Sequence, residues 1–143
     1  MLLPSLAPPP GARPHNAATA APVTILVFTR TTGYHHASIP TAVAAVRAIG
    51  RRDGFAVVVT ENPHAFTDAS LRRVRAVAFL LTTGTVLDAA QRGALEQFVR
   101  HGGGWLGVHS AGDTEYAWPF YGRLVGAYFR HHPAIQAAPV DSR

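Results

Sequence analysis

Histidines occur in this chain where a sheet of parallel strands would need them to build a polar site. The pair His35–His36 follows the first strand-like run, and His109 follows a glycine-rich run in Gly107-Val108-His109-Ser110. The carboxyl ends of parallel strands share one edge of a sheet, and ligands bind at that edge. We therefore expect these histidines, far apart in the sequence, to meet in one polar pocket.

His109 occupies a tight turn that follows directly on a predicted strand. Such a turn presents one side chain at the carboxyl edge of the sheet, with backbone N–H groups nearby. A histidine there suits the role of acid, base or metal ligand, but it is a poor acyl nucleophile in hydrolysis. We predict that His109 is catalytic as an acid or base, or serves as a ligand. The alternative is a histidine that is merely hydrogen-bonded in a loop.

An alternative interpretation of the same turn makes Ser110 the nucleophile of a serine hydrolase. The run from His109 to Gly112 imitates part of a lipase-type elbow, but Val108 stands where that motif has its first glycine. No convincing aspartate-then-histidine pair follows it in the chain. We expect the turn to direct Ser110 away from the site, and we keep the hydrolase as an alternative.

Further polar residues follow the predicted first and third strands. Neighbouring side chains of an extended segment point in opposite directions, so only one of His35 and His36 is expected to face the site. The hydroxyls of Thr82 and Thr83, which precede Gly84, are candidates to hold a sugar hydroxyl or a phosphate; the alternative is a plain turn. The sequence thus adds two substrate-binding candidates after the third strand.

Two carboxylates follow His109 closely, Asp113 and Glu115. Asp113 is placed to orient the imidazole or to act as a base, although helix capping explains it equally well. The aromatic residues between 116 and 121 are able to stack on a sugar ring, but core packing is the commoner role of such a cluster. We expect Asp113 to be the more useful of the two carboxylates.

Strand-like and helix-like segments alternate along the chain. Strands are expected at residues 23–28, 55–60, 76–81 and 105–108, and helices at 40–52, 67–74, 88–101 and 123–128. This alternation predicts an α/β fold with a parallel sheet and right-handed crossovers.

The two ends of the chain differ from this pattern. Residues 1–22 are rich in proline and alanine and read as a disordered leader before a domain over 23–143. A last strand is expected at 134–140, with no helix after it. We therefore expect the domain to be incomplete at its C-terminus, less stable than a longer relative, and prone to homo-oligomerise through its uncovered strand edge.

Composition narrows the class of protein. The chain has 143 residues and no cysteine, which excludes disulfides, thiolate metal sites and a cysteine nucleophile. Its net charge is +5, but the 13 basic residues are all arginines scattered along the chain, so we predict no nucleic-acid partner. No apolar run is long enough for a membrane span, and prolines interrupt any signal peptide, so we expect a cytoplasmic protein.

Four ordered segments resemble the ThuA-like (trehalose utilisation) family. They lie at 29–40, 79–87, 102–118 and 121–133, and the resemblance covers almost everything from Val23 onward. It implies a class I glutamine amidotransferase-like, flavodoxin-like doubly wound sandwich that lacks the usual cysteine nucleophile. It also implies a small-molecule carbohydrate as partner, trehalose-type disaccharides or their 3-keto derivatives. The alternative to an enzyme is a non-catalytic sugar-binding module or inactive fragment.

Carried over residue by residue, the resemblance selects His36, His109, Asp113 and His132 as site residues, whereas His35 departs from the family pattern. His36 and His132 would bind substrate, and Asp113 would orient His109. Neutral imidazoles are common zinc ligands, and a catalytic zinc needs three protein ligands. A divalent metal at His36, His109 and His132 is therefore a further expectation, and a metal-free hydrogen-bonded cluster is its alternative.

Overall fold

Four parallel strands form the centre of the part of the chain that the computed structural model describes, residues 22–134 and 137. Their order is β2-β1-β3-β4, and each pair is parallel. The strands are β1 (Thr24–Phe28), β2 (Ala56–Thr60), β3 (Ala76–Leu80) and β4 (Gly104–Val108). This is the beginning of the flavodoxin-like order, in which β2 is added on one side of β1 and β3 and β4 on the other, so that the strand order reverses between β1 and β3. The predicted α/β class and parallel sheet are confirmed.

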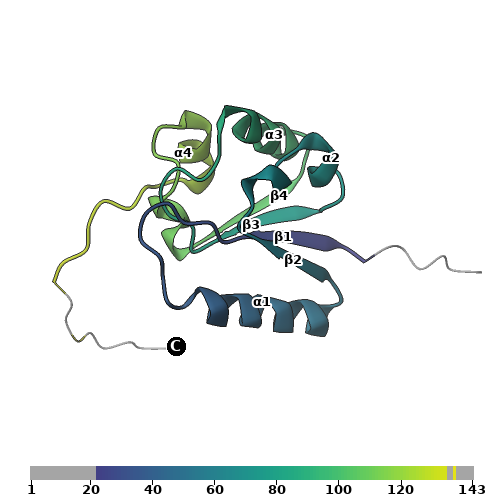
Figure 1. Cartoon of the computed structure of the whole chain (residues 1–143), viewed down its shortest axis with the longest axis horizontal. Helices are drawn as coiled ribbons and strands as arrows, with labels where there is room; N and C mark the ends of the chain where they lie inside the picture. Colours follow the sequence, from purple (N-terminus) through teal and green to yellow (C-terminus); the bar gives the residue numbers. More distant parts are fainter. Residues whose placement is uncertain (1–21, 135–136, 138–143) are drawn as a thin grey trace, which may run out of the picture.

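Helices cover the sheet on both faces (Figure 1). One face carries α1 (Ile39–Asp53), and the other carries α2 (Asp68–Leu71), α3 (Ala89–Arg100) and α4 (Pro119–Val125). Two short 3-10 turns, η1 (Pro63–Ala65) and η2 (His109–Asp113), complete the described elements. None of the described helices is both long and apolar enough to cross a membrane.

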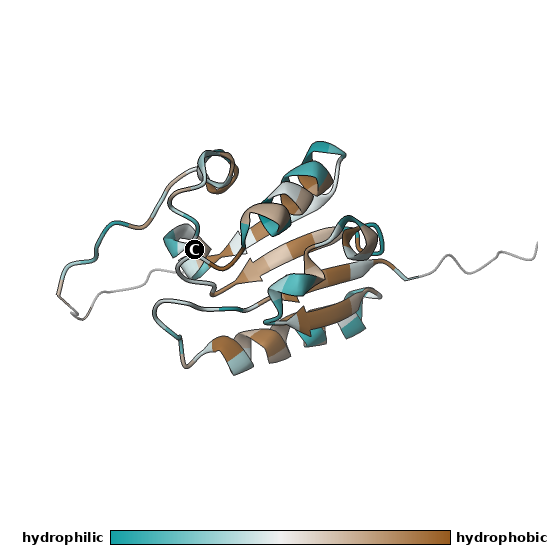
Figure 2. Cartoon of the chain, turned by 45° about the horizontal axis from the view of Figure 1, so that its top comes forward, coloured by the Kyte–Doolittle hydropathy of each residue, from teal (hydrophilic) through white to brown (hydrophobic). Residues whose placement is uncertain are grey.

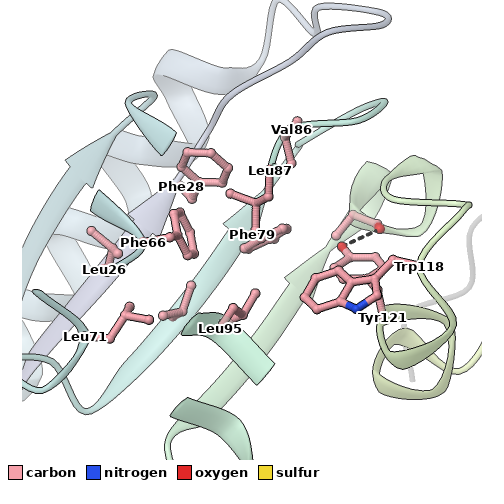
Figure 3. Close-up of a cluster of buried hydrophobic side chains, with 12 residues drawn as sticks. Leu26, Phe28, Phe66, Leu71, Phe79, Val86, Leu87, Leu95, Trp118 and Tyr121 are labelled. Carbon is pink, nitrogen blue, oxygen red and sulfur yellow. Dashed lines mark hydrogen bonds between the residues drawn. The ribbon is translucent and has the colours of Figure 1, made fainter. Parts of the chain in front are cut away.

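Alternating side chains of the strands supply two hydrophobic cores. Leu26 and Phe28 face the larger core beneath α3 and α4, whereas Val27 between them faces α1. Much of the length of the strands is accordingly coloured toward the hydrophobic end of the scale in Figure 2. In the larger core, Phe79 contacts the rings of Phe28 and Tyr121, at centroid separations of 5.3 and 5.6 Å (Figure 3). This packing fixes the sheet under the loops that carry the site.

The helix ends follow local signals. Asp88 caps α3 through a reciprocal pair of hydrogen bonds with Gln91, as its position predicts. Gly54 ends α1 with a φ of 79°. The helix expected at 123–128 is shifted: α4 begins at Pro119, whose fixed φ suits a first helical turn, and ends before Gly126, whose φ is 81°.

Two expectations at the chain ends fall mostly on residues that are not described. The leader expected at 1–22 lies outside the described residues except for residue 22, and so does most of the strand expected at 134–140. The described fold therefore begins near the start of β1 and continues past α4 to Ala134.

Candidate functional site

His36 and His109 meet at the carboxyl edge of the sheet. Their Nε2 atoms are 3.2 Å apart, and their ring centroids are separated by 4.8 Å with planes inclined at 76°. His36 comes from the loop between β1 and α1, and His109 directly follows β4. The expected meeting of these two histidines is found, although β3 lies between the strands that carry them.

The turn at His109 has the strained backbone expected of a strand-to-helix elbow. His109 has a φ of 54°, in the left-handed region that residues with a side chain rarely adopt. The turn continues into η2, so the chain changes direction abruptly at this residue. The reversal turns the imidazole toward His36.

The two imidazoles share a cavity of about 570 Å3. Its lining combines polar side chains with aromatic rings: Tyr34, His36, His109, Ser110, Asp113, Phe129 and His132. Four predicted site residues, His36, His109, Asp113 and His132, therefore line one cavity, whereas His35 is exposed outside it. A cavity of this size is in the usual range for small-molecule sites.

The contact between the two Nε2 atoms constrains protonation. A hydrogen bond between them needs one nitrogen to donate and the other to accept, so the contact holds one proton. Burial lowers the pKa of His36 below its ordinary value of 6.5, and the neighbouring charge of His109 lowers it further. Asp113 acts in the opposite direction and raises this pKa. His36 is consequently neutral at neutral pH.

Ser110 lies in the site, contrary to expectation. It is buried, it lines the cavity, and its Oγ lies 3.5 Å from Nδ1 of His36. The elbow exposes His109, and the tight 3-10 turn that follows brings the next side chain back toward the same cavity. Sequence reasoning treated the two residues as mutually exclusive occupants of the site, whereas the turn presents both.

Asp113 makes its hydrogen bond away from the imidazoles. The Tyr116 hydroxyl lies 2.7 Å from Oδ1 of Asp113 and 2.6 Å from the carbonyl of Phe129. Burial and the Asp113 carboxylate together raise the pKa of Tyr116 to about 12. Among the described contacts no hydrogen bond joins Asp113 to His109. The orienting role expected for Asp113 is therefore not supported by a direct hydrogen bond.

Thr82 and Thr83 require a correction, because both are fully buried outside the cavity. The Thr82 hydroxyl is 2.9 Å from that of Thr114, and the Thr83 hydroxyl donates to the carbonyl of Tyr34 at 2.8 Å. Their hydrogen-bonding capacity is used by the protein, so the expected substrate contacts are not available. They instead connect the loop after β3 to the loops that carry His109 and His36.

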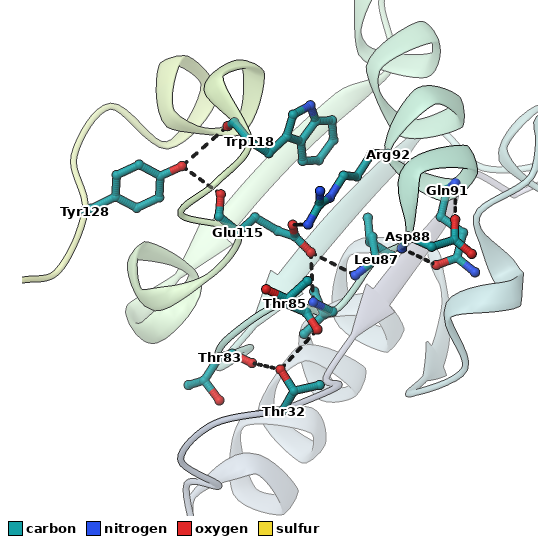
Figure 4. Close-up of polar contacts among 11 residues, drawn as sticks. Thr32, Thr83, Thr85, Leu87, Asp88, Gln91, Arg92, Glu115, Trp118 and Tyr128 are labelled. Atoms are coloured by element: carbon teal, nitrogen blue, oxygen red, sulfur yellow. Dashed lines mark hydrogen bonds and ion pairs between the residues drawn. The ribbon is translucent and has the colours of Figure 1, made fainter.

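Glu115 is also buried, and it serves the fold rather than the cavity (Figure 4). Its Oε1 accepts hydrogen bonds from the backbone N–H groups of Val86 and Leu87, both at 2.8 Å. Arg92 Nη2 forms an ion pair with Oε2 at 2.5 Å. Glu115 therefore ties the segment that follows η2 to α3 and does not form a carboxylate pair with Asp113.

The residues of the cavity match the expected metal only in part. Two nitrogen ligands of a tetrahedral zinc lie about 3.3 Å apart, close to the 3.2 Å between the Nε2 atoms. However, residues 22–134 and 137 contain no group of three histidine, aspartate or glutamate side chains arranged to hold a metal. His132 lines the cavity, but its Nδ1 lies 2.8 Å from the Pro133 carbonyl. The described arrangement therefore lacks a preformed third ligand.

Sequence reasoning missed two aromatic residues of the cavity, Tyr34 and Phe129. Their side chains are 70% and 45% exposed, and each lies beside a cavity histidine. The available signal was their spacing, since Tyr34 precedes His36 by two residues and Phe129 precedes His132 by three.

Comparisons with known proteins identify the family from the sequence and support the fold from a solved structure. A family model described as ThuA, trehalose utilisation, matches residues 24–143. Among solved structures, a protein described as ThuA-like from Bacteroides uniformis ATCC 8492 is similar, with a TM-score of 0.61 and 23% sequence identity. The match covers 80% of this chain and 47% of that one, so this chain spans about half the length of that relative. No match is found among the curated proteins.

Proposed function

The chain belongs to the ThuA, trehalose utilisation, family, and from this premise we propose that it binds trehalose-type disaccharides or their 3-keto derivatives in the cavity of His36 and His109 and transfers a proton there. The single observation that carries the proposal is the contact of the two Nε2 atoms, 3.2 Å apart, inside a cavity of about 570 Å3.

The imidazole pair is suited to a proton transfer next to a carbonyl. When a keto sugar displaces the histidine–histidine hydrogen bond, the accepting Nε2 takes the proton from the carbon beside the carbonyl. The electrons of the broken C–H bond pass to the carbonyl, which becomes an enolate, and the other Nε2–H donates to its oxygen. The neutral state of His36 favours it as the base. His109 is then the donor.

Hydrogen exchange tests this proposal. We expect the protein to catalyse exchange of the C–H beside the keto group of 3-ketotrehalose in D2O, followed by NMR. His36→Gln and His109→Gln should each slow exchange about a hundredfold. The matched control is His64→Gln, because His64 is an exposed histidine in η1 outside the cavity.

The outcomes separate enzyme from binding module. Exchange at the rate of buffer alone, with the sugar bound, means a non-catalytic sugar-binding module. Exchange that survives both glutamine variants places the chemistry elsewhere. A protein that binds neither trehalose nor 3-ketotrehalose overturns the proposal.

A serine hydrolase using Ser110 is the second candidate, favoured by the 3.5 Å approach of Ser110 Oγ to His36. His36 contacts another imidazole through Nε2 where a triad would supply a carboxylate. Labelling by a fluorophosphonate that disappears in Ser110→Ala would establish this candidate. We expect no labelling.

A divalent metal at His36, His109 and His132 stays a prediction, and a third ligand would have to move into place to complete it. Elemental analysis of purified protein and calorimetric titration with zinc test it. Stoichiometric zinc that is lost in His132→Ala would support the three-histidine site, and no affinity for added zinc would eliminate it.

A further inference from the structure

Tyr34 and Phe129 expose aromatic rings at the same cavity, from opposite ends of the described sequence. Single exposed aromatic residues are common on protein surfaces. Two exposed aromatic residues at one cavity are less common, and this cavity also contains imidazole, hydroxyl and carboxylate groups. Such a combination of apolar walls and a few polar groups is typical of small-molecule sites.

The backbones of both residues are anchored although their rings are exposed. The carbonyl of Tyr34 accepts from the buried Thr83 hydroxyl at 2.8 Å. Phe129 donates from its N–H to the carbonyl of Gly112 at 2.8 Å, and its own carbonyl lies 2.6 Å from the Tyr116 hydroxyl, whose single proton it shares with Asp113. The two rings are therefore held in an exposed position by hydrogen-bonded backbone. A ligand that covers them would bind a preorganised surface.

Each ring also lies against a cavity histidine. Tyr34 contacts His36 in an edge-to-face arrangement, with centroids 4.8 Å apart and planes at 84°. Phe129 lies beside His132 at 6.0 Å. The aromatic walls are thus adjacent to the groups that would hydrogen-bond a ligand's hydroxyls.

We propose that Tyr34 and Phe129 are stacking platforms for the pyranose rings of a disaccharide, and that they make the site select rings over open-chain polyols of similar polarity. A pyranose ring has an apolar face of C–H groups and a rim of hydroxyls. The aromatic faces would pack against the C–H face of the ring, and His36, Ser110 and Asp113 would hydrogen-bond its hydroxyls. This inference rests on the proposed carbohydrate function and names what determines its specificity.

Calorimetric titration with trehalose tests the platforms, with the open-chain polyol sorbitol as the comparison ligand. Tyr34→Ala and Phe129→Ala should each weaken trehalose binding about tenfold, because each removes one aromatic contact surface. Tyr34→Phe keeps the ring and loses only the hydroxyl, so it should bind within about twofold of the unaltered protein. Val58→Ala is the matched control, since Val58 is 49% exposed and lies outside the cavity.

A second readout excludes a merely structural effect. The ring protons of bound trehalose should shift upfield in NMR spectra, through ring currents that are lost in the alanine variants and kept in Tyr34→Phe. If the unaltered protein binds trehalose but both alanine variants bind equally well, the platforms are wrong and the carbohydrate function stands. If the unaltered protein binds no trehalose, the proposed function fails together with the platforms. Equal affinity for sorbitol and trehalose overturns the selection of rings.

Discussion

The contact between His36 and His109 makes the two imidazoles behave as one group with respect to protons. A proton on one Nε2 alone serves the hydrogen bond between them, whereas protons on both would leave two donors facing each other 3.2 Å apart without an acceptor. Asp113 raises the pKa of His36, but by less than burial and His109 each lower it. The pair is therefore suited to accept one proton and return it.

We expect an NMR titration to place the pKa of His36 below 6.5, chiefly because burial disfavours the imidazolium and secondarily because His109 lies beside it. In His109→Gln the pKa should rise toward 6.5 without reaching it, since burial remains. An unchanged pKa in that variant would contradict the coupling of the two rings.

The lowered pKa of His36 also makes the stability of the folded protein depend on pH. The unfolded chain binds a proton at His36 near pH 6.5, whereas the folded chain resists it until the pH is lower. The free energy of unfolding should therefore fall as the pH drops from 6.5 to the lowered pKa. His36→Gln should flatten this part of the pH profile measured by urea unfolding.

The sequence predicted which residues lie near the site better than it predicted where their side chains point. His36 and His109 were identifiable because they follow strands at turns rich in glycine. Ser110, Thr82 and Thr83 were misjudged because the direction of a loop side chain depends on φ and ψ angles that residue types do not determine. The positive φ of Leu81 and of His109 rotates the side chains that follow these two residues.

Among the elements, the loop after β3 is the part that holds the site together. It is hydrogen-bonded to the β1 loop through Thr32 and Thr83, and to η2 through Gly84 and Asp113, so it lies between the segments that carry His36 and His109. The spacing of the two imidazoles depends on this central segment.

Gly84→Ala should disturb that segment. Gly84 has a φ of 77°, and a Cβ there would lie 2.4 Å from the Thr32 hydroxyl oxygen and 3.1 Å from the Gly33 nitrogen. Left-handed strain and crowding together should lower the free energy of unfolding by about 3 kcal/mol.

The matched control is Gly54→Ala, at a φ of 79° with nothing within 4 Å of the added Cβ, which should cost only about 1 kcal/mol. Chemical denaturation measures both. Equal losses would show that crowding against the β1 loop does not matter.

Glu115→Gln tests the connection between α3 and the segment that follows η2. Removing the charge leaves Arg92, whose side chain is 23% exposed, without its partner, and we expect a loss of about 3 kcal/mol. Glu96→Gln removes a carboxylate from the ion pair with Arg100 on the same helix, and it should change stability by no more than about 0.5 kcal/mol. Urea unfolding compares the two, and similar losses would refute a special role for Glu115.

The strands were located to within about a residue because each is a short run of five residues without charge, and the two central strands, β1 and β3, are apolar and largely buried. It placed α4 too late, since the buried Trp118 and Tyr121 read as a separate aromatic segment although Pro119 begins the helix between them. The pairing of Glu115 with Arg92 was beyond prediction, because it joins residues distant in sequence through the packing of α3.

At the scale of the whole molecule, the two edges of the sheet are not equivalent. On β2, Val57 and Val59 pack beneath α1. On β4, which pairs only with β3 among the described residues, Leu106 lies on the same face of the sheet and is 57% exposed. Alternation of strands and helices predicted a parallel sheet but not this order, which depends on long-range packing. The uncovered edge expected at 134–140 falls mostly outside the described residues, and the described sheet has β2 and β4 as its two edge strands.

We predict that the chain associates with a second copy through β4. The strand Gly-Trp-Leu-Gly-Val carries no charge and no proline, the devices that usually protect an edge from pairing. Two copies related by a twofold axis would pair β4 with β4 and bury both Leu106 side chains. Analytical ultracentrifugation should show a concentration-dependent dimer. Leu106→Lys should shift it toward monomer, because the charge would be buried in the interface, whereas Val58→Lys, at a residue 49% exposed on the opposite edge strand, should leave it unchanged. A monomer at every concentration, or a dimer broken by Val58→Lys and not by Leu106→Lys, would show that β4 is not the interface.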